Sequence, residues 1–347
     1  MTKSLRDDYP YNVINYPSLG ADIDTSNNQF MTNQMGIDTI QQIANYETVV
    51  KMVERMGLTI EPMPKSNKLH KKITDEVKAD TNRRFNIDKF TPIVERVKLP
   101  KVKGRSKALY ISIVRNTPTL FDVATHHKKA KDSFCMLTYA GLHQPSKKVS
   151  SDAMKIISQF LKRKTFKLHS VDIAIDTTDH RSITYKRKES FRDNLMPYSK
   201  HGVICKGSSL YINNLDHLEE HPNMSRVIYY DKYLKQLNQQ KKEIITNDLR
   251  AWKRLEVTLS FDVTRRENRG FIAYIESMGF VDDVYSIDEV AGLAGVKSYD
   301  DDYLIYQLNS LIDNRFMNNQ ESKEQFNSVQ SLERFKSSDF RRYLLPI

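Results

Sequence analysis

The spacing of hydrophobic positions along the chain changes at about residue 105. Before that point, apolar side chains in residues 37–56 recur at the spacing of one helix face, and Gly57 follows them as a cap. A second helix is expected at about residues 71–85. Residues 1–35 are polar with scattered prolines, which predicts an irregular arm. From residue 105 onward the period is close to two, which indicates β-strands.

The segments of period two predict a succession of strands with helices inserted between them. Strands are expected at residues 108–114, 134–140, 167–176, 202–206, 209–213, 225–230 and 252–261, and helices at residues 151–162, 231–245, 265–278, 287–294 and 301–316. This order indicates an α+β fold with helices packed on a central antiparallel sheet. We expect an N-terminal arm and helical region at 1–104, an α+β domain at 105–262 and a helical C-terminal region at 263–347.

The charge of the chain is strongly basic. Its 54 Lys and Arg outnumber 43 Asp and Glu, and the net charge of +11 favours a polyanionic partner such as nucleic acid. Residues 96–131 contain ten basic residues and one acid, which indicates either a surface that follows DNA phosphates or a solvated charged face. The residues expected to bind DNA are Arg96, Lys98, Lys101, Lys103, Arg105, Lys107, Arg115, Lys128, Lys129 and Lys131. The aromatic residues in or next to this run either stack on unpaired bases or belong to the core; they are Tyr110, Phe121, Phe134 and Tyr139.

Other features of the composition indicate the compartment. No segment approaches the roughly 18 apolar residues of a membrane helix, and residues 1–10 lack the apolar stretch of a signal peptide. Cys135 and Cys205 lie too far apart in sequence for a metal-binding pair, so buried free thiols are expected. We therefore expect a cytoplasmic protein with no membrane partner.

Two of the expected strands carry carboxylates on one face. Asp172, Ala174 and Asp176 alternate with Val171, Ile173 and Ile175, so both aspartates point to the same side. In residues 252–261, Glu256 shares a polar face with Arg254. If the two strands are neighbours, Asp172 and Glu256 lie close together and suit Mg²⁺ or Mn²⁺. The alternative is a cross-strand ion pair, and Asp176 is either a further ligand or the end of its strand.

A third strand ends in a group of tyrosines. Tyr230 lies where residues 225–230 are expected to pass into a helix, with Lys232 just after it. A phenol, with a reference pKa near ~10, attacks phosphorus only when its proton is removed, and a nearby ammonium favours that state. The alternative is ordinary aromatic packing of Tyr229, Tyr230 and Tyr233.

Taken in order, the three segments resemble the rolling-circle replication initiators. These include the trans-acting plasmid initiators, related relaxases of integrative elements and the gene II-type endonucleases of filamentous phages. The match consists of residues 171–176 (Val-Asp-Ile-Ala-Ile-Asp), residues 228–232 (Ile-Tyr-Tyr-Asp-Lys) and residues 254–257 (Arg-Leu-Glu-Val), within about 105–262. The chain has Ser170 and Val171 where many members have Arg, and it lacks the His-hydrophobe-His metal motif of better-known nickases.

The resemblance implies a nickase-like fold and a specific reaction. Tyr230 would attack a phosphate of origin DNA that is single-stranded at the nick site, form a 5′-phosphotyrosine link and release a 3′-OH primer. Asp172, Glu256 and, less directly, Asp176 would hold a divalent ion, while Lys232 and Arg254 would offset developing charge. A host helicase on the acidic segment 282–302 and a homodimer are further expectations, because a second cut needs Tyr233 or a second subunit.

Three other classes of protein fit parts of the pattern. A repressor or degenerate initiator would keep the sheet and the basic charge and would form no covalent bond. A tyrosine recombinase would place a late tyrosine in a helical domain, and the strands around Tyr230 argue against it. A structural protein of a phage or mobile element would use its charge only for assembly with nucleic acid.

Overall fold

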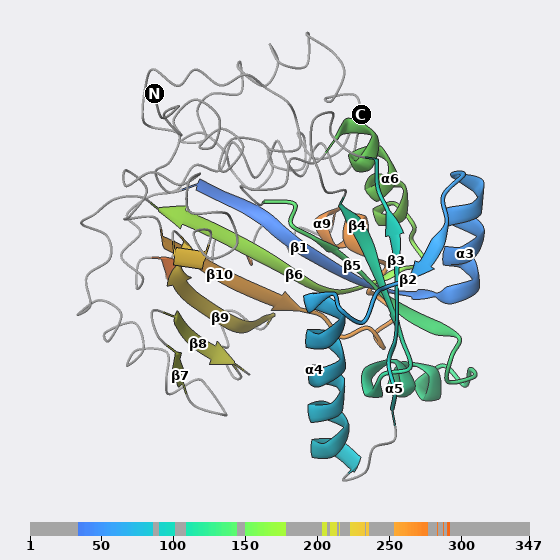
Figure 1. Ribbon diagram of the computed structural model, residues 1–347, viewed down its shortest axis with the longest axis horizontal. Helices are drawn as coiled ribbons and strands as arrows, with labels where there is room; N and C mark the ends of the chain where they lie inside the picture. Colours follow the sequence, from blue (N-terminus) through green and yellow to red (C-terminus); the bar gives the residue numbers. More distant parts are fainter. Residues whose placement is uncertain are drawn as a thin grey trace.

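The computed structural model describes residues 34–85, 90–100, 109–143, 150–177, 203–206, 209–213, 215, 223–232, 234–235, 253–276, 283, 287, 290 and 291. These residues form a ten-stranded sheet in the order β2-β3-β4-β5-β1-β6-β10-β9-β8-β7, and every pairing is antiparallel. Helices lie on both of its faces (Figure 1). The α+β fold with a central antiparallel sheet is therefore confirmed.

The strands carry most of the described chain. They are β1 (Gln34–Asn45), β2 (Ile60–Pro62), β3 (Ile93–Lys98), β4 (Tyr110–Arg115), β5 (Phe134–Ala140), β6 (Lys167–Thr177), β7 (Val203–Lys206), β8 (Ser209–Asn213), β9 (Met224–Asp231) and β10 (Lys253–Ser260). The seven strands expected after residue 105 are all present, with ends shifted by at most two residues. β2 and β3 were not predicted.

Five described helices cover the sheet. They are α3 (Tyr46–Arg55), α4 (Lys68–Phe85), α5 (Pro118–His126), α6 (Ser151–Leu161) and α9 (Phe271–Glu276). Side chains cap three of them, because Asn45, Thr117 and Ser150 each accept a hydrogen bond from a backbone N–H in the first turn. None of these helices combines the length and the apolar character needed to span a bilayer.

The prediction of a helix at residues 37–56 is wrong in its first half. Residues up to Asn45 form β1, which pairs with β5 and β6 in the middle of the sheet, and the helix α3 begins only at Tyr46. Irregularities interrupt the pairing of β1 with β6 between Ile37 and Thr39 and between Gln41 and Gln42. An extra residue at such a bulge returns side chains three apart to one face, which imitates a helical spacing. As a result, the sheet draws strands from both sides of the boundary expected at residue 104.

Other expectations differ in extent or lie outside the described residues. The helix expected at 265–278 is reduced to α9, because residues 261–270 form turns. The helix α5 was not predicted. Of the arm expected at 1–35, residues 34 and 35 begin β1 and the rest lies outside the described residues. In the helices expected at 231–245 and 287–294 the described residues are helical, except that residue 231 ends β9; they are 232, 234, 235, 287, 290 and 291. The helix expected at 301–316 and nearly all of the acidic segment 282–302 lie outside the described residues.

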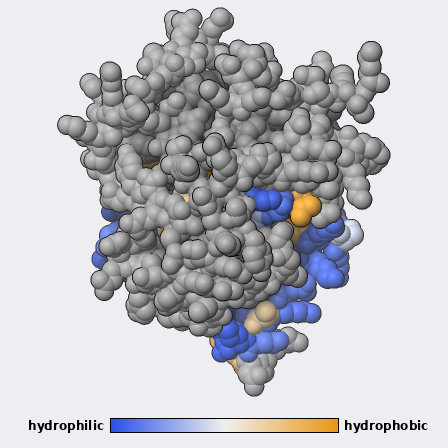
Figure 2. Space-filling view, turned by 90° about the vertical axis from the view of Figure 1, so that its left-hand side faces the viewer, coloured by the Kyte–Doolittle hydropathy of each residue, from blue (hydrophilic) through white to orange (hydrophobic). Residues whose placement is uncertain are grey.

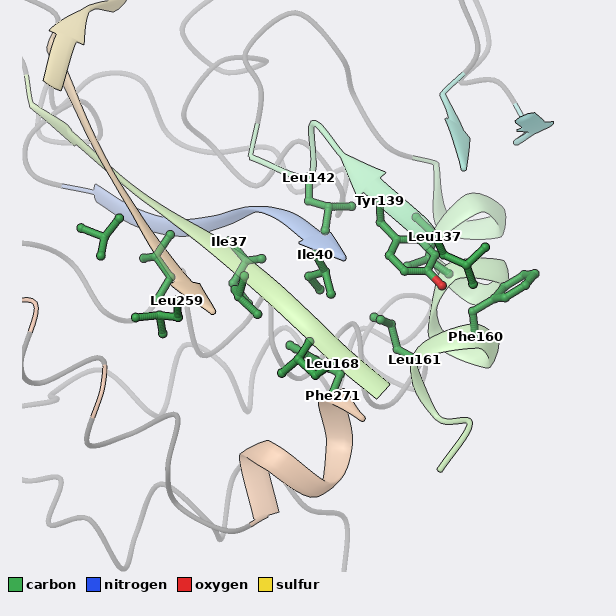
Figure 3. Packing of buried hydrophobic residues seen from close by; sticks show 14 of the residues in the cluster. Ile37, Ile40, Leu137, Tyr139, Leu142, Phe160, Leu161, Leu168, Leu259 and Phe271 are labelled. Carbon is green, nitrogen blue, oxygen red and sulfur yellow. The ribbon is translucent and has the colours of Figure 1, made fainter. Parts of the chain in front are cut away.

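The main core lies on one face of the sheet, under α3, α6 and α9. Strand side chains such as Ile37, Leu137 and Leu168 pack against Phe160 and Phe271 from the helices (Figure 3). Two smaller clusters on the opposite face hold α5 and α4 over the β3–β5 part of the sheet. In the view from the left of Figure 1, the described surface is mainly hydrophilic (Figure 2).

Candidate active site on the polar face of the sheet

Three neighbouring strands bring the predicted chemical groups to one face. β10 pairs with β6 on one side and β9 on the other, so directly opposed residues form rows across three strands. The three rows are Asp176–Arg254–Tyr230, Ala174–Glu256–Ile228 and Asp172–Thr258–Arg226. The strands that carry Asp172 and Glu256 are therefore neighbours, as expected. Glu256 stands opposite Ala174 and is a diagonal neighbour of both aspartates.

Arg254 is the centre of a buried charge network. Its side chain is fully buried, and its Nε and Nη2 donate to the two carboxylate oxygens of Asp176 at 2.8 and 2.7 Å. Nη1 donates to Asp38 at 3.3 Å, and Nη2 also donates to the backbone oxygen of His143 at 3.1 Å. Glu256 Oε1 lies 3.7 Å from Nη1. The guanidinium therefore joins β10 to β6, to β1 and to the segment after β5.

Asp176 is held ionised by this network. Burial alone would raise its pKa, but the Arg254 guanidinium and the hydrogen bond with His143 outweigh burial and hold the pKa well below its usual range. His143 Nε2 lies 2.7 Å from Asp176 Oδ2, and burial lowers the pKa of the imidazole despite that carboxylate. The ring is therefore neutral at neutral pH, and the tautomer with Nε2–H donates to Asp176.

The Tyr230 hydroxyl lies on the polar face, between the Glu256 carboxylate and the Lys235 ammonium. It donates to Glu256 Oε1 at 2.5 Å and accepts from Lys235 Nζ at 3.0 Å. Burial, and then the charge of Glu256, raise the pKa of the phenol well above its ordinary value. Tyr229 points to the other face and belongs to the main core. Of the two tyrosines, Tyr230 is thus the one beside the charged groups.

Two lysines lie near the Tyr230 ring. Lys235 Nζ is 4.2 Å and Lys232 Nζ 5.9 Å from the ring centroid. Lys232 is fully buried, and burial, followed by repulsion from Arg254, lowers the pKa of its ammonium well below the ordinary value. Lys235 is therefore the lysine that contacts the phenol oxygen directly.

The pKa values of the Asp172 and Glu256 carboxyls are shifted in opposite directions. Burial raises the pKa of Asp172 to about 6, although Arg226 and a 2.6 Å hydrogen bond from Thr258 oppose it. Burial would also raise the pKa of Glu256, but the positive charges of Lys235, Arg254 and Lys232 outweigh it and lower the pKa. Glu256 is therefore ionised at neutral pH, and Asp172 gains most of its charge only above about pH 6.

The carboxylates fit a divalent ion only in part. Both oxygens of Asp176 are engaged by Arg254 and His143, so Asp176 does not suit a metal ligand. Asp172 and Glu256 share a face and provide the oxygen ligands that Mg²⁺ and Mn²⁺ prefer. Among the described residues no group of three or more His, Cys, Asp or Glu is arranged to hold a metal ion. An ion on this pair would therefore take further ligands from a bound phosphate or water.

Three contributors to the site were not expected from the sequence. Asp38 was assigned to a helix, and the bulge in β1 brings it to Arg254. His143 follows β5 in a segment without a periodic pattern, and Lys235 lies five residues after Tyr230. The signal available in the sequence was the position of Lys235 about one turn into the helix expected after Tyr230.

The residues expected to bind DNA are dispersed. Arg96 and Lys98 pair with Glu61 of β2, and Arg115 pairs with Glu95 and stacks on the Tyr46 ring. Lys128, Lys129 and Lys131 are exposed after α5, and Lys101, Lys103, Arg105 and Lys107 lie outside the described residues.

The aromatic residues of this region pack inside the protein. Tyr139 is buried in the main core, and Phe121 packs against Phe85 and Phe90. Phe134 and Tyr110 are partly buried against the smaller clusters. The stacking interpretation is therefore wrong for Tyr139. Cys135 is a buried free thiol, as expected, and burial raises its pKa.

Comparison with known proteins identifies no family for the chain. No protein-family model matches it, and no curated protein matches its sequence. A solved structure of the rolling circle replication initiator protein from Geobacillus stearothermophilus aligns with a TM-score of 0.33 and 12% sequence identity, over 86% of this chain and 97% of that chain. A similarity at this level does not establish a shared fold.

Proposed function

We propose that the protein is a rolling-circle DNA replication initiator that nicks one strand of its origin through Tyr230. The observation that carries the proposal is the position of the Tyr230 hydroxyl, which contacts the Glu256 carboxylate and the Lys235 ammonium on the face that also presents Asp172. A nucleophile, a proton acceptor and a positive charge thus meet at one oxygen.

In the proposed reaction, the Tyr230 oxygen attacks a backbone phosphorus while its proton passes to Glu256 Oε1. The bond to the 3′ oxygen breaks, which leaves a 5′-phosphotyrosine and, after protonation, a free 3′-OH. Lys235 stabilises the charge that develops on the phenol oxygen, because its ammonium already contacts that atom. The phenol keeps its proton before the reaction, since its pKa is raised by burial and by Glu256.

The remaining residues of the site position the reacting groups and neutralise charge. Arg254 holds Asp176 and places positive charge beside Glu256. Its Nε, Nη1 and Nη2 donate to Asp176, Asp38 and the backbone oxygen of His143, so it acts without contacting the phosphate itself. Lys232 adds a second amine below the Tyr230 ring. Asp172 and Glu256 would hold a Mg²⁺ or Mn²⁺ ion, which would polarise the scissile phosphate.

A non-catalytic DNA-binding protein is the second candidate function. The observation that favours it is the burial of Tyr230, whose side chain is only 4% exposed. In that case the Tyr230–Glu256–Lys235 contacts only stabilise the sheet, and DNA binding does not depend on the phenol oxygen.

Nicking of supercoiled DNA that carries candidate origins separates the two functions. With Mg²⁺ or Mn²⁺, we expect the wild type and Tyr229→Phe to form open circles, and Tyr230→Phe to lose at least about 10³-fold of the rate, as for loss of a nucleophile. Chelation of the metal should stop the wild type. If the wild type cuts no origin under any metal, or if Tyr230→Phe cuts at the wild-type rate, the nicking proposal is wrong.

A further inference from the structure

Three basic segments meet at the end of the sheet opposite Tyr230. They are residues 126–132 after α5, residues 162–167 before and at the start of β6, and residues 262–269 after β10. Lys167 Nζ donates to the backbone oxygen of Arg265 at 3.0 Å, and its charge acts on both Arg269 and His127. His126 likewise acts on Asp262. The segments therefore form one continuous surface, toward the α5 side of Figure 1.

The loop after β10 is fixed rigidly to β6. Asn268 accepts from the backbone N–H of Leu168 at 2.9 Å and donates to its carbonyl oxygen at 2.7 Å, like a further strand residue. Gly270 has a φ of +92°, and a Cβ there would clash with the backbone oxygen of Phe166. Arg265, Arg266 and Arg269 thus project from a loop with a defined backbone.

The charge of this surface is one-sided. Within the three segments only Asp132, Asp262 and Glu267 are acidic, and Asp262 pairs with Arg265. All the lysines and arginines are exposed except the half-buried Lys167. We call the following residues the basic end surface: Lys128, Lys129, Lys131, Lys162, Arg163, Lys164, Lys167, Arg265, Arg266 and Arg269.

The chemistry of the basic end surface suits duplex DNA better than unpaired bases. Proteins that hold single strands stack the bases on exposed aromatic rings. In the described part of this surface no Phe, Tyr or Trp ring is exposed; its exposed rings are the imidazoles of His126 and His127, which pack edge to face against each other. Flexible exposed lysines and arginines contact phosphates and not base faces.

β6 sets the distance between the basic end surface and the Tyr230 site. Lys167 lies in the basic end surface and Asp176 lies in the row of Tyr230, and the nine residue steps between them at about 3.3 Å each span about 30 Å. That length is close to one helical turn of DNA, about 34 Å.

We propose that the basic end surface binds duplex DNA through its phosphates, about one helical turn from the strand that Tyr230 cuts. The spacing rests on the proposed nicking function, whereas the duplex binding does not. The surface shares Lys128, Lys129 and Lys131 with the run 96–131, whereas Arg96, Lys98 and Arg115 of that run pair with acids of the sheet and lie outside it.

Duplex binding by a neutralised variant tests the inference. The variant Arg265→Gln, Arg266→Gln, Arg269→Gln is compared with Lys71→Gln, Lys72→Gln, Lys78→Gln, which removes the same charge from the exposed side of α4. Fluorescence anisotropy with an origin duplex at several salt concentrations gives the affinity and its salt dependence. Thermal melting confirms that both variants are folded.

We expect the arginine variant to lose at least about tenfold in duplex affinity, with a salt slope lower by about 2 to 3, since each phosphate contact contributes about 0.9. The α4 variant should lose about twofold or less, and nicking of a single-stranded oligonucleotide should be unchanged in both. Equal losses in the two variants, or no duplex binding by the wild type, would overturn the inference. A protein that binds duplex through these arginines and never nicks would instead overturn the proposed function alone.

Discussion

His143 is a fully buried imidazole whose pKa is lowered by burial, even though Asp176 lies 2.7 Å from its Nε2. In the unfolded chain the same group titrates near ~6.5. Between the lowered pKa of the folded protein and ~6.5, the unfolded state binds more protons, so stability rises with pH in that window. The contribution of Asp176, whose pKa is also lowered, is lost only at a lower pH, below about 3.9.

We therefore predict that His143 lowers the free energy of unfolding as the pH drops below about 6.5, by up to about 1.4 kcal/mol per pH unit. Asp172, whose pKa is raised from 3.8 to about 6, acts in the opposite direction between those two values, so the contribution of His143 is read from the difference between the wild type and a variant. His143→Gln keeps an amide donor for Asp176 and does not titrate, so its stability should depend less on pH between 7 and 5. Urea unfolding at a series of pH values measures this slope. The control is His126→Gln, at an exposed position. An unchanged slope in His143→Gln would contradict the assignment.

The residues of the site differ in how far sequence predicts them. The period of two places Asp172, Glu256 and Tyr230 on one face, because the side chains of a strand alternate. Lys235 and His143 come from segments that follow the strands, and no periodicity specifies where such segments lead. Asp176 was assigned to a metal because the pattern of its own strand shows a carboxylate. That pattern does not show that Arg254 of the neighbouring strand stands opposite Asp176 and pairs with it.

At the scale of elements, the Arg254–Asp176 pair joins β10 to β6, and Asp38 extends it to β1. A guanidinium removed from such a site leaves a buried carboxylate without its counter-charge. The ion pair of Arg96 with Glu61 is similar in chemistry, but it lies at an edge of the sheet and is partly exposed. The two pairs therefore differ mainly in burial.

We predict that Arg254→Met lowers the free energy of unfolding by about 3–5 kcal/mol, whereas Arg96→Met lowers it by about 1 kcal/mol or less. The double variant Arg254→Met, Asp176→Leu should recover part of the loss, because no unpaired charge of this pair remains buried. Urea denaturation of the wild type, Arg254→Met, Asp176→Leu and the double variant provides the cycle, and Arg96→Met is measured beside it. Equal effects of Arg254→Met and Arg96→Met would show that burial does not govern this pair.

Elements with a regular period were predicted well, and irregular ones were not. β5 and α6 agree with the sequence within one residue, because their patterns are uninterrupted and a serine caps the helix. β1 was mistaken for a helix because the bulge at Asp38 places Ile37 and Ile40, three residues apart, on one face, while Ile43 is buried on the opposite face. β3 was missed because the consecutive charged residues Glu95 and Arg96 interrupt its alternation; they lie on opposite faces and pair with neighbouring elements instead of marking a loop.

At the scale of the whole molecule, the sheet separates two charged regions. The polar face of β6, β9 and β10 carries Tyr230 near one end of these strands, and the basic end surface lies at the other end (Figure 1). A duplex bound at one end and a cut strand at the other would use the full length of β6. The order of the strands, which the sequence does not specify, creates this separation.

The central claim is that Tyr230 forms the covalent bond to DNA, and mass spectrometry of the trapped product tests it most directly. The wild type is incubated with an oligonucleotide that it cuts, and the adduct is digested with nuclease and trypsin. Cleavage after Arg226 and Lys232 yields residues 227–232, which contain both Tyr229 and Tyr230. We predict a nucleotide on Tyr230, and no adduct in Tyr230→Phe. A nucleotide on Tyr229, or cleavage without any covalent adduct, would contradict the claim.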